Sequence, residues 1–419
     1  MVPEVSAVRC VYWANAMFSE ADRDFNAKCA RRLREAGYKV TLPQEACVNV
    51  EKEPSAAGIF RIDTAAILDS DAVIACLDQE CIDSGVATEI GVAYAFGVPM
   101  IGFYTDIRRT RVGRGRMYKN LYVLGAVEEH GRIVVSLDEL LEALPAVASG
   151  QRAAGERLTA HYGRVARGYD AFVERLESWY QPPFIASDVI SSWVRELKPR
   201  RVLEIGCGTG ATAARICRDQ ESLSYVGFDL SAGMVEVANA RLASDRCSFT
   251  TDFDSVTTLS GSGPFDLVLA LFTLHDHADP KETLRGVRRC LRSSGHLGIM
   301  DLSQQDLPGL TEHLRRGLAR PALCANPRLS AAWLRRSVVK LGLDLVECRL
   351  ALTSVAFPTA DDIDEYLDTF GIYAGMDLPL GLRPSSQEEN RVAARRVLSA
   401  AQYPFSDDRV FLICRLVAR

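Results

Sequence analysis

Hydrophobic and polar positions in the first part of the chain alternate between two periods. Short apolar runs at residues 9–13, 39–42 and 99–104 predict strands, and the unbroken run at 72–77 is typical of a strand buried on both faces. Apolar residues with a period near 3.6 predict helices at residues 20–36, 60–69 and 85–96, of which the first is followed by Gly37 as a stop. This alternation over about 145 residues predicts a parallel, doubly wound α/β domain.

The same alternation returns from about residue 158 to residue 302, so a second α/β domain is expected. Beyond it, residues 330–341 predict a helix that ends at Gly342, and residues 344–353 and 409–417 predict two apolar strands. The stretch between these strands carries helical signals at 361–370 and 387–401. The small and polar residues 146–157 indicate a linker or the start of a connecting helix.

Composition narrows the class of protein without naming a reaction. With 419 residues, 48% hydrophobic and 25% charged, the chain is typical of a globular protein with two domains. A net charge of −5 provides no basic field for nucleic acid, and the short arginine clusters at 108–116 and 315–316 are typical of solvated surface. We find neither a signal-peptide pattern nor an apolar run of about 18 residues, so we expect a cytoplasmic protein without a membrane partner.

Twelve cysteines are scattered along the chain, several of them inside apolar runs, which indicates reduced thiols of a cytoplasmic protein. Cys76 and Cys81 have no second pair at metal-binding spacing. We therefore expect no metal.

Three carboxylates of the first domain are placed so that they could lie close together at the carboxyl ends of the predicted strands. Asp83 stands just before the predicted helix at 85–96, Glu89 follows about one turn into it, and Asp63 belongs to the preceding predicted helix. Open α/β folds bind ligands at the carboxyl ends of their strands. Cleavage of a glycosidic bond uses one carboxylate on the anomeric carbon and an acid for the leaving group. A structural reading is the alternative, with Asp83 as an N-cap, Glu89 as a helix-dipole partner and Asp63 as a surface charge.

Neighbouring residues add a family resemblance. The segments 11–18 (VYWANAMF), 71–75 (DAVIA), 83–85 (DSG) and 89–93 (EIGVA) resemble the nucleoside 2-deoxyribosyltransferase family, as do Asp63 and the pair Asn120 and Gly125. The family spacing of twenty residues from Asp63 to the next aspartate, and six more to the glutamate, is met here.

The resemblance implies a role for each matched carboxylate. Glu89 would be the nucleophile on the anomeric carbon, Asp63 would handle the proton of the departing base, and Asp83 would orient the sugar. Tyr12 would hydrogen-bond near Glu89, although core packing is an equally good interpretation of this tyrosine.

The resemblance also implies a set of substrate-binding residues. These are Met17, Phe18, Gln44 and Asn120, with Glu45 beside Gln44 as a loosely aligned base contact. For Phe18, core packing is the alternative. Because Asn120 would reach into a neighbouring subunit's site, the resemblance implies a homo-oligomer.

One departure from the family leaves the reaction open. Residues 107–119 are longer and more basic than the usual connection, and their arginines could bind a 5′-phosphate, as relatives that hydrolyse nucleoside 5′-monophosphates require. Those arginines are Arg108, Arg109, Arg111, Arg114 and Arg116. Some phosphate-binding relatives carry serine at the position of Asp83, and a carboxylate there would repel a phosphate. Transfer of deoxyribose and hydrolysis of a nucleoside or nucleotide both stay open.

A second signature opens the second domain. Residues 201–210 (RVLEIGCGTG) place an apolar strand with Glu204 directly before Gly206, Gly208 and Gly210 and a helix. Glycines let the backbone approach a ligand, and the amides at the start of the helix point toward it. A dinucleotide site is the alternative interpretation of such a turn.

Later residues favour a methyl-donor site. Asp229 ends the next predicted strand, where a carboxylate can accept both ribose hydroxyls, and Asp252 with Phe253 follows a further strand and would meet adenine. This order resembles class I S-adenosylmethionine-dependent methyltransferases. The resemblance implies S-adenosyl-L-methionine as the cofactor.

The same resemblance implies features of the acceptor side. Tyr162 and Tyr169 resemble a lid over a small acceptor, with packing of a connecting helix as the alternative. His275, or His277 two residues later, could deprotonate a hydroxyl or amine, although methyl transfer can also proceed by proximity alone. An exocyclic amine of DNA is not indicated, because no Asn-Pro-Pro-Tyr element follows residues 265–271.

The expected fold class is α/β, with two doubly wound parallel-sheet (Rossmann-like) domains, the second with an antiparallel final strand pair and helical insertions. We expect a nucleoside 2-deoxyribosyltransferase-like domain at 1–148, a linker at 149–160, and a methyltransferase domain at 161–419 with a cap from 304–328 and 356–404. The expected function is bifunctional: N-glycosidic bond chemistry and methylation of a small molecule in the biosynthesis of a modified nucleoside or nucleobase. The alternative is a methyltransferase that a non-catalytic, nucleotide-sensing N-terminal domain regulates.

Overall fold

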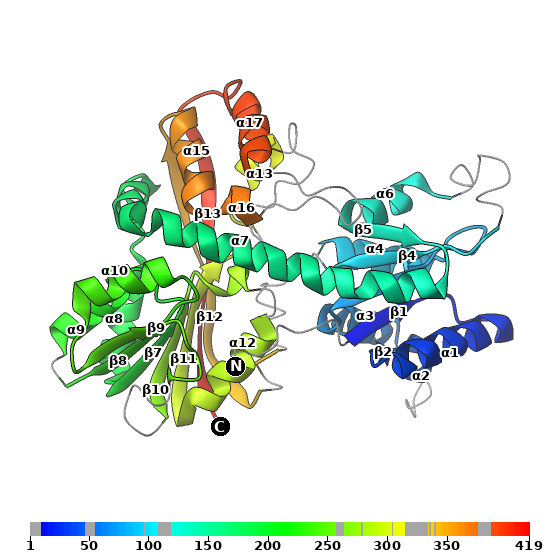
Figure 1. The fold of residues 1–419 in the computed structure, drawn as a ribbon, viewed down its shortest axis with the longest axis horizontal. Coiled ribbons are helices and arrows are strands. Elements are labelled where there is room, and N and C mark those ends of the chain that lie inside the picture. Colours follow the sequence, from blue (N-terminus) through cyan, green and yellow to red (C-terminus); the bar gives the residue numbers. More distant parts are fainter. Residues whose placement is uncertain are drawn as a thin grey trace. The chain divides into compact units, whose positions relative to one another are not determined.

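A computed structural model of the 419-residue chain describes most of it. The described residues exclude 1–9, 47–54, 96–97, 108–118, 221, 257–263, 278–279, 304, 315–333, 335–336, 339–340 and 376–386. The chain divides into two compact units, with Glu4–Arg152 as the main part of one and Ala153–Asp377 with Ser385–Arg419 as the other (Figure 1).

The first unit contains a five-stranded parallel sheet in the order β2-β1-β3-β4-β5. Its strands are β1 (Cys10–Ala14), β2 (Lys39–Thr41), β3 (Ala72–Cys76), β4 (Met100–Phe103) and β5 (Gly131–Val134). All residues of β3 and β4 are buried, as an unbroken apolar run predicts for a sheet covered on both faces. The predicted doubly wound parallel domain is confirmed.

Helices cover this sheet on both faces. They are α1 (Glu20–Glu35), α2 (Pro43–Ala46), α3 (Ala56–Asp69), α4 (Ser84–Ala95) and α6 (Leu121–His130). Leu33 of α1 packs into one core with Val11 and Trp13 of β1. Because side chains alternate along a strand, Tyr12 faces the opposite side of the sheet. There its hydroxyl meets Glu89 of α4.

The segment expected to be a linker or the start of a connecting helix belongs to a single helix, α7 (Leu137–Glu177). It is 41 residues long and continues through Pro145 without interruption. Near its start Leu140 and Leu144 join the core of the first unit, and near its end Phe172 and Leu176 join a core of the second. Packing at both ends holds a segment whose small, polar composition locally indicates a break.

The second unit is built on an eight-stranded sheet in the order β6-β12-β13-β11-β10-β7-β8-β9. Its strands are β6 (Tyr180–Gln181), β7 (Arg201–Ile205), β8 (Ser224–Phe228), β9 (Cys247–Thr250), β10 (Phe265–Leu271), β11 (Leu291–Leu302), β12 (Leu343–Phe357) and β13 (Phe405–Ala418). Strands β7 to β11 are mutually parallel, whereas β13 is antiparallel to both β11 and β12. The predicted α/β class with an antiparallel final pair is confirmed.

Helices α8 (Ala186–Leu197), α9 (Ala211–Asp219), α10 (Ala232–Leu242) and α12 (Pro280–Cys290) accompany this sheet (Figure 1). The long insertion between β12 and β13 holds α15 (Ala360–Thr369), α16 (Ile372–Gly375) and α17 (Gln387–Leu398), close to the predicted helices at 361–370 and 387–401. With α13 (Pro308–Leu314) they share a core that includes Leu310, Tyr366 and Leu398. The predicted helix at 330–341 lies mostly outside the described residues. The same holds for the part of the expected cap at 304–328 that follows α13.

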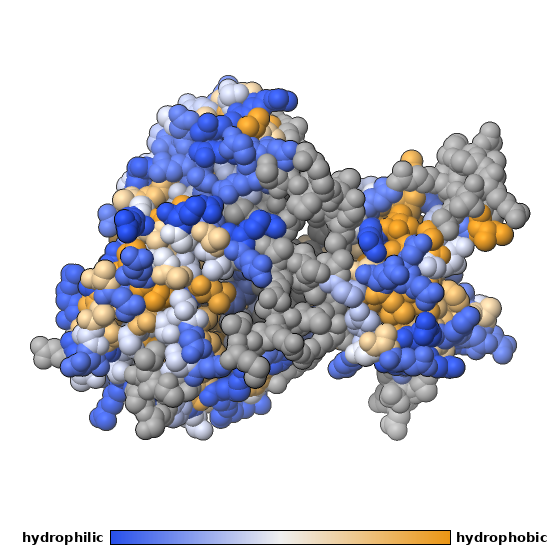
Figure 2. Space-filling model, in the orientation of Figure 1, coloured by the Kyte–Doolittle hydropathy of each residue, from blue (hydrophilic) through white to orange (hydrophobic). Residues whose placement is uncertain are grey.

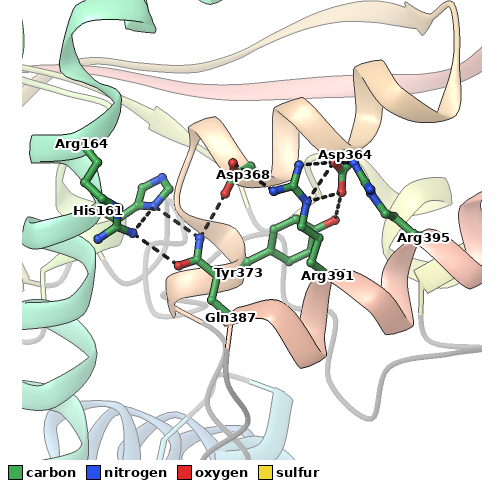
Figure 3. A network of polar contacts seen from close by, with 8 residues as sticks. All are labelled: His161, Arg164, Asp364, Asp368, Tyr373, Gln387, Arg391 and Arg395. Carbon is green, nitrogen blue, oxygen red and sulfur yellow. Dashed lines mark hydrogen bonds and ion pairs between the residues drawn. The ribbon is translucent and has the colours of Figure 1, made fainter.

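A polar network ties the helices of this insertion together (Figure 3). Asp364 of α15 accepts hydrogen bonds from Arg391 and Arg395 of α17 and from the hydroxyl of Tyr373 in α16. Gln387, at the first residue of α17, donates to Asp368 of α15 at 3.0 Å. The insertion is therefore fixed by charge as well as by its apolar core.

Candidate active sites

The first candidate site lies around Glu89, in the second turn of α4. The hydroxyl of Tyr12 donates to Oε1 of Glu89 at 2.5 Å, and Tyr12 itself is completely buried. Burial raises the pKa of Glu89 to about 7, although the hydrogen bond from Tyr12 acts in the opposite direction. The charges of Asp63 and Asp83 also contribute to the rise.

Asp83 also has a structural task. Its Oδ1 accepts hydrogen bonds from the backbone amides of Gly85 at 2.8 Å and Val86 at 3.2 Å, and so caps the start of α4. Asp63 comes from α3, and burial raises the pKa of its carboxyl. The two hydrogen bonds bear out the structural interpretation of Asp83 as a cap, and the assignment of all three carboxylates to one catalytic site stays a prediction.

The loop after β1 holds the predicted base-contacting residues. Its backbone is held by Arg23, whose guanidinium donates to the carbonyl oxygens of Met17 and Phe18 at 3.2 and 3.1 Å. The Phe18 ring is 75% exposed, so core packing does not explain this residue. Gln44 accepts from Asn26 at 3.0 Å and donates to the Arg23 carbonyl at 3.1 Å.

Asn26 is a residue that the sequence did not single out. It is buried on α1, where it accepts from Trp13 Nε1 and Asn15 Nδ2 and donates to the Ala16 carbonyl. The sequence could have pointed to Asn26 because it is a polar residue on the apolar face of a predicted helix. A buried polar group of this kind needs hydrogen-bond partners. Asn26 thereby fixes the loop between β1 and α1 that carries Met17 and Phe18.

Other predicted residues of this domain have partners of their own or fall outside the described residues. Asn120 caps α6, with its side-chain oxygen accepting from the Tyr122 amide at 3.0 Å. Glu45 forms an ion pair with Arg34 at 2.6 Å. The five arginines of the basic segment, at 108–116, fall in the part of the chain that the structure does not describe.

The second candidate site is the turn between β7 and α9. Gly206, Gly208 and Gly210 all have positive φ angles, of 70°, 51° and 74°. A Cβ atom at Gly206 would lie 2.2 Å from the Thr273 hydroxyl oxygen. Only glycine fits such a backbone at this close approach.

Asp229 organises this turn from the end of β8. Its Oδ2 accepts from the Gly208 amide at 2.9 Å, and its Oδ1 accepts from the Ser231 amide at 2.8 Å. Burial raises the pKa of Asp229, whereas these two hydrogen bonds act in the opposite direction. A carboxylate in this place suits the ribose hydroxyls of a bound nucleoside.

Glu204 lies deeper than its predicted role suggests. It is buried within β7, and the hydroxyl of Tyr225 donates to its Oε2. Burial raises the pKa of Glu204 to about 8, against the hydrogen bonds from Tyr225 and Thr212. The described structure therefore shows Glu204 as a protonatable acid within the sheet, and its contact with a cofactor stays a prediction.

Asp252 and Phe253 follow β9, one strand beyond Asp229. The Phe253 ring packs edge-on against Phe228 with 5.2 Å between centroids, and Asp252 accepts from the Asp254 amide at 3.0 Å. S-adenosyl-L-methionine needs backbone amides at a glycine turn, a carboxylate that accepts from the ribose hydroxyls, and an aromatic surface for adenine. The residues present fit this cofactor.

A chain of hydrogen bonds and ion pairs lies beside the turn. Nδ1 of His275 is 2.5 Å from Oδ1 of Asp301, and Nε2 is 3.4 Å from Oδ1 of Asp276. The hydroxyl of Tyr162 donates to the other oxygen of Asp276 at 2.9 Å. Burial lowers the pKa of His275, but the charges of Asp276 and Asp301 outweigh it and raise the pKa to about 9.

This geometry disfavours His275 as the base that the sequence offered. At neutral pH the ring is protonated, and each of its nitrogens faces a carboxylate. A ring in that state has no lone pair with which to accept a proton from a substrate. His277 faces Thr283 through Nδ1 at 2.7 Å and Thr273 through Nε2 at 3.3 Å.

The two tyrosines of α7 lie near the same centre. The Tyr162 and Tyr169 rings are 6.2 Å apart, and Phe370 packs edge-on against Tyr169 at 5.8 Å. Burial raises the pKa of both tyrosines, and the charge of Asp229 contributes in each case. Their packing against each other and against Phe370 fits the alternative of a connecting helix as well as that of a lid, and the lid stays a prediction.

Family models match a segment of each of the two units. Residues 11–138 match the family model for nucleoside 2-deoxyribosyltransferase, and residues 203–297 match the model for a methyltransferase domain. The chain thus carries a nucleoside 2-deoxyribosyltransferase-like domain followed by a methyltransferase domain. The match of the second domain supports S-adenosyl-L-methionine as its cofactor.

Individual relatives resemble parts of this chain. A demethylmenaquinone methyltransferase of Bacteroides fragilis is 26% identical over 27% of this chain and 48% of its own length. A conserved protein from Enterococcus faecalis V583 is 34% identical over 33% of this chain and 98% of that chain, with a TM-score of 0.30. A methyltransferase from Geobacter sulfurreducens, solved with S-adenosyl-L-homocysteine, is 19% identical over 56% of this chain and 90% of that chain, with a TM-score of 0.36. This chain spans about half the length of the Bacteroides relative.

Proposed function

We propose that the nucleoside 2-deoxyribosyltransferase-like domain breaks the N-glycosidic bond of a nucleoside or nucleoside 5′-monophosphate, with Glu89 as the nucleophile. The observation that carries this proposal is the contact between Tyr12 and Glu89 beside Asp63 and Asp83. A carboxyl group held by one short hydrogen bond has a fixed orientation. Its raised pKa reports an enclosed environment of the kind found at reactive carboxylates.

The proposed reaction has two steps. Glu89 attacks the anomeric carbon, the bond to the base nitrogen breaks, and the electron pair leaves with the base, which takes a proton from Asp63. Water or a second base then attacks the anomeric carbon, returns a proton to Asp63 and releases Glu89 as a carboxylate. Water as the second nucleophile makes the domain an N-glycosidase, and a base makes it a deoxyribosyltransferase.

A panel of substrates tests this proposal. The full chain is incubated with CMP, cytidine, deoxycytidine and the matching purine compounds without S-adenosyl-L-methionine, and free base is followed by chromatography. We expect base release that Glu89→Gln abolishes and that Asp138→Asn, a change in an exposed ion pair with Arg32, leaves intact. If the Glu89→Gln variant still released base, Glu89 would not be the nucleophile.

The alternative is a nucleotide-sensing domain that regulates methylation. Retention of three converging carboxylates favours catalysis, because a domain that only binds needs no nucleophile. If the same panel gave no base release, while one nucleotide bound and altered the methylation rate, the sensing function would replace the catalytic one.

For the methyltransferase domain we propose methylation of a small molecule at a nitrogen or oxygen. S-adenosyl-L-methionine supplies an activated methyl group at the turn of Gly206, Gly208 and Gly210. An acceptor nitrogen or oxygen that took up this methyl group would have to release a proton. Asp276 takes this proton in place of His275, because burial raises the pKa of its carboxyl and the hydrogen bond from Tyr162 fixes its orientation.

Variants at Asp276 test that assignment with the nucleosides, nucleotides and free bases of the panel as acceptors. Asp276→Asn is expected to lower the methylation rate at least about tenfold. Its affinity for S-adenosyl-L-homocysteine should stay within about twofold of wild type in calorimetry, because the proposed role concerns the acceptor. A parallel loss of affinity would assign Asp276 to the cofactor instead.

Joining the two reactions on one chain suits consecutive steps on one compound, so we place the enzyme in the biosynthesis of a modified nucleoside or nucleobase.

We also propose a homo-oligomer formed through the first domain. Large apolar side chains are exposed on α3 and α6, and the visible face of this unit carries a broad apolar area (Figure 2). They are Ile59, Phe60, Ile62, Leu121 and Tyr122. Light scattering of the full chain measures the oligomeric state directly, and a monomer at micromolar concentration would contradict it.

A further inference from the structure

Two pairs of cysteine sulfur atoms approach each other closely among the described residues. Cys348 and Cys414 have their sulfurs 2.8 Å apart, and Cys217 and Cys247 have theirs 3.3 Å apart. All four are free thiols in the structure. Neither pair belongs to the sites described above, and the sequence indicated only scattered reduced thiols.

Cys348 and Cys414 lie directly opposite each other on neighbouring strands. Cys348 belongs to β12 and Cys414 to β13, and the two are partners in the antiparallel register. Opposite residues of an antiparallel pair have Cα atoms about 4.5–5.5 Å apart. A disulfide requires Cα atoms about 4.4–6.8 Å apart, so the backbone already has the necessary geometry.

The two thiols also differ in access. Cys414 is buried, whereas Cys348 is half-buried and therefore open to a small reagent. We propose that Cys348 and Cys414 form a reversible disulfide in exchange with a low-molecular-weight disulfide such as oxidised glutathione. The Cys348 thiolate attacks one sulfur of that reagent and expels one thiol, which gives a mixed disulfide. Cys414 then loses its proton, attacks the Cys348 sulfur and expels the second thiol.

The exchange balances as a two-electron reaction. The protein dithiol loses two electrons and two protons, and the small disulfide is reduced to two thiols. The new bond would link the two strands that flank the insertion carrying α15, α16 and α17. It would therefore close a loop around the cap, and β13, which carries Arg409 beside Tyr366 of α15, would be held to β12.

Cys217 and Cys247 provide an internal control. Both are buried, and they lie on a helix and a strand, α9 and β9, instead of on paired strands. Burial raises the pKa of Cys217 well above its usual range, so little reactive thiolate is present. Exposed Cys81 is the positive control, because any active disulfide reagent should modify it.

The test uses the full chain, reduced and then equilibrated with oxidised glutathione, followed by alkylation, digestion and mass analysis of peptides. We expect a Cys348–Cys414 linked peptide that lacks two hydrogen atoms, and its loss on return to reduced glutathione. Cys348→Ser should abolish it, and Cys217→Ser should leave it unchanged. The linked form should unfold about 5 °C higher than the reduced form. If Cys81 is modified while Cys348 and Cys414 stay alkylatable, or Cys348 carries only glutathione, the proposal is overturned.

Discussion

The hydroxyl of Tyr12 lies 2.5 Å from Oε1 of Glu89, although 77 positions separate the two residues in the chain. Tyr12 comes from the central region of a parallel sheet and Glu89 from a helix on one of its faces. The contact exists because β1 and β3 are neighbours in the sheet and α4 follows β3 directly. It fixes the orientation of the proposed nucleophile and lowers its pKa against the larger effect of burial.

Removal of this hydroxyl gives a prediction about pH dependence. The pKa of Glu89 is about 7, and the hydrogen bond from Tyr12 lowers it against the effect of burial. Base release should therefore rise with pH through about 7 in wild type, since the ionised carboxylate is the nucleophile. In Tyr12→Phe the inflection should move to higher pH. The rate at pH 6.5 should fall roughly tenfold, in line with the loss of a hydrogen bond to a charged group. An unchanged pH profile of kcat/KM would separate Tyr12 from the ionisation of Glu89.

We predict that one added methyl group at Gly206 severely weakens cofactor binding at the glycine turn. In Gly206→Ala the added Cβ would meet the Thr273 side chain at 2.2 Å, on a backbone with a φ of 70°. We expect at least a tenfold loss of affinity for S-adenosyl-L-homocysteine in calorimetry. Gly208→Ala is the matched comparison, because its φ is also positive but no atom lies within 4 Å of the added carbon. Equal losses in both variants would show that backbone strain, and not the contact with Thr273, decides the effect.

The Asp364 network predicts a loss of stability away from both sites (Figure 3). The side chain of Asp364 is 3% exposed and accepts from two arginines, which lower its pKa although burial alone would raise it. Asp364→Ala should reduce the free energy of unfolding by about 2 kcal/mol, less than for a fully buried pair because both arginines are partly exposed. Chemical denaturation measures this change. Glu365→Ala breaks an exposed ion pair with Arg175, and its effect should stay below about 1 kcal/mol.

Because the pKa of His275 is raised, we predict that the folded chain loses stability at alkaline pH. Its pKa in the folded chain, about 9, is higher than the ordinary value of 6.5. The folded state therefore keeps a proton that the unfolded state releases, so the stabilisation is complete below about pH 6.5 and is lost as the pH rises through about 9. The free energy of unfolding should fall over this window. His275→Gln should flatten that slope, whereas His296→Gln, at a ring whose pKa burial lowers, should not.

Local patterns in the sequence determined several features of the molecule. Apolar runs and helical periods predicted most strands and helices, because burial on both faces of a sheet demands such residues. The turn of Gly206, Gly208 and Gly210 was visible because its backbone conformation admits little besides glycine. The position of Asp83 at the start of α4 was visible because a helix leaves its first amides without partners.

The tertiary structure decided what depends on residues far apart in the chain. The small and polar residues 146–157 left a linker and a connecting helix open, and in the structure they belong to one helix whose Leu144 and Phe172 pack into separate cores. His275 was a candidate base until Asp301, 26 residues later, placed a carboxylate on its ring. Sequence patterns report the conformation of neighbours along the chain, whereas burial and the charges of distant residues set which groups meet and which proton each one holds.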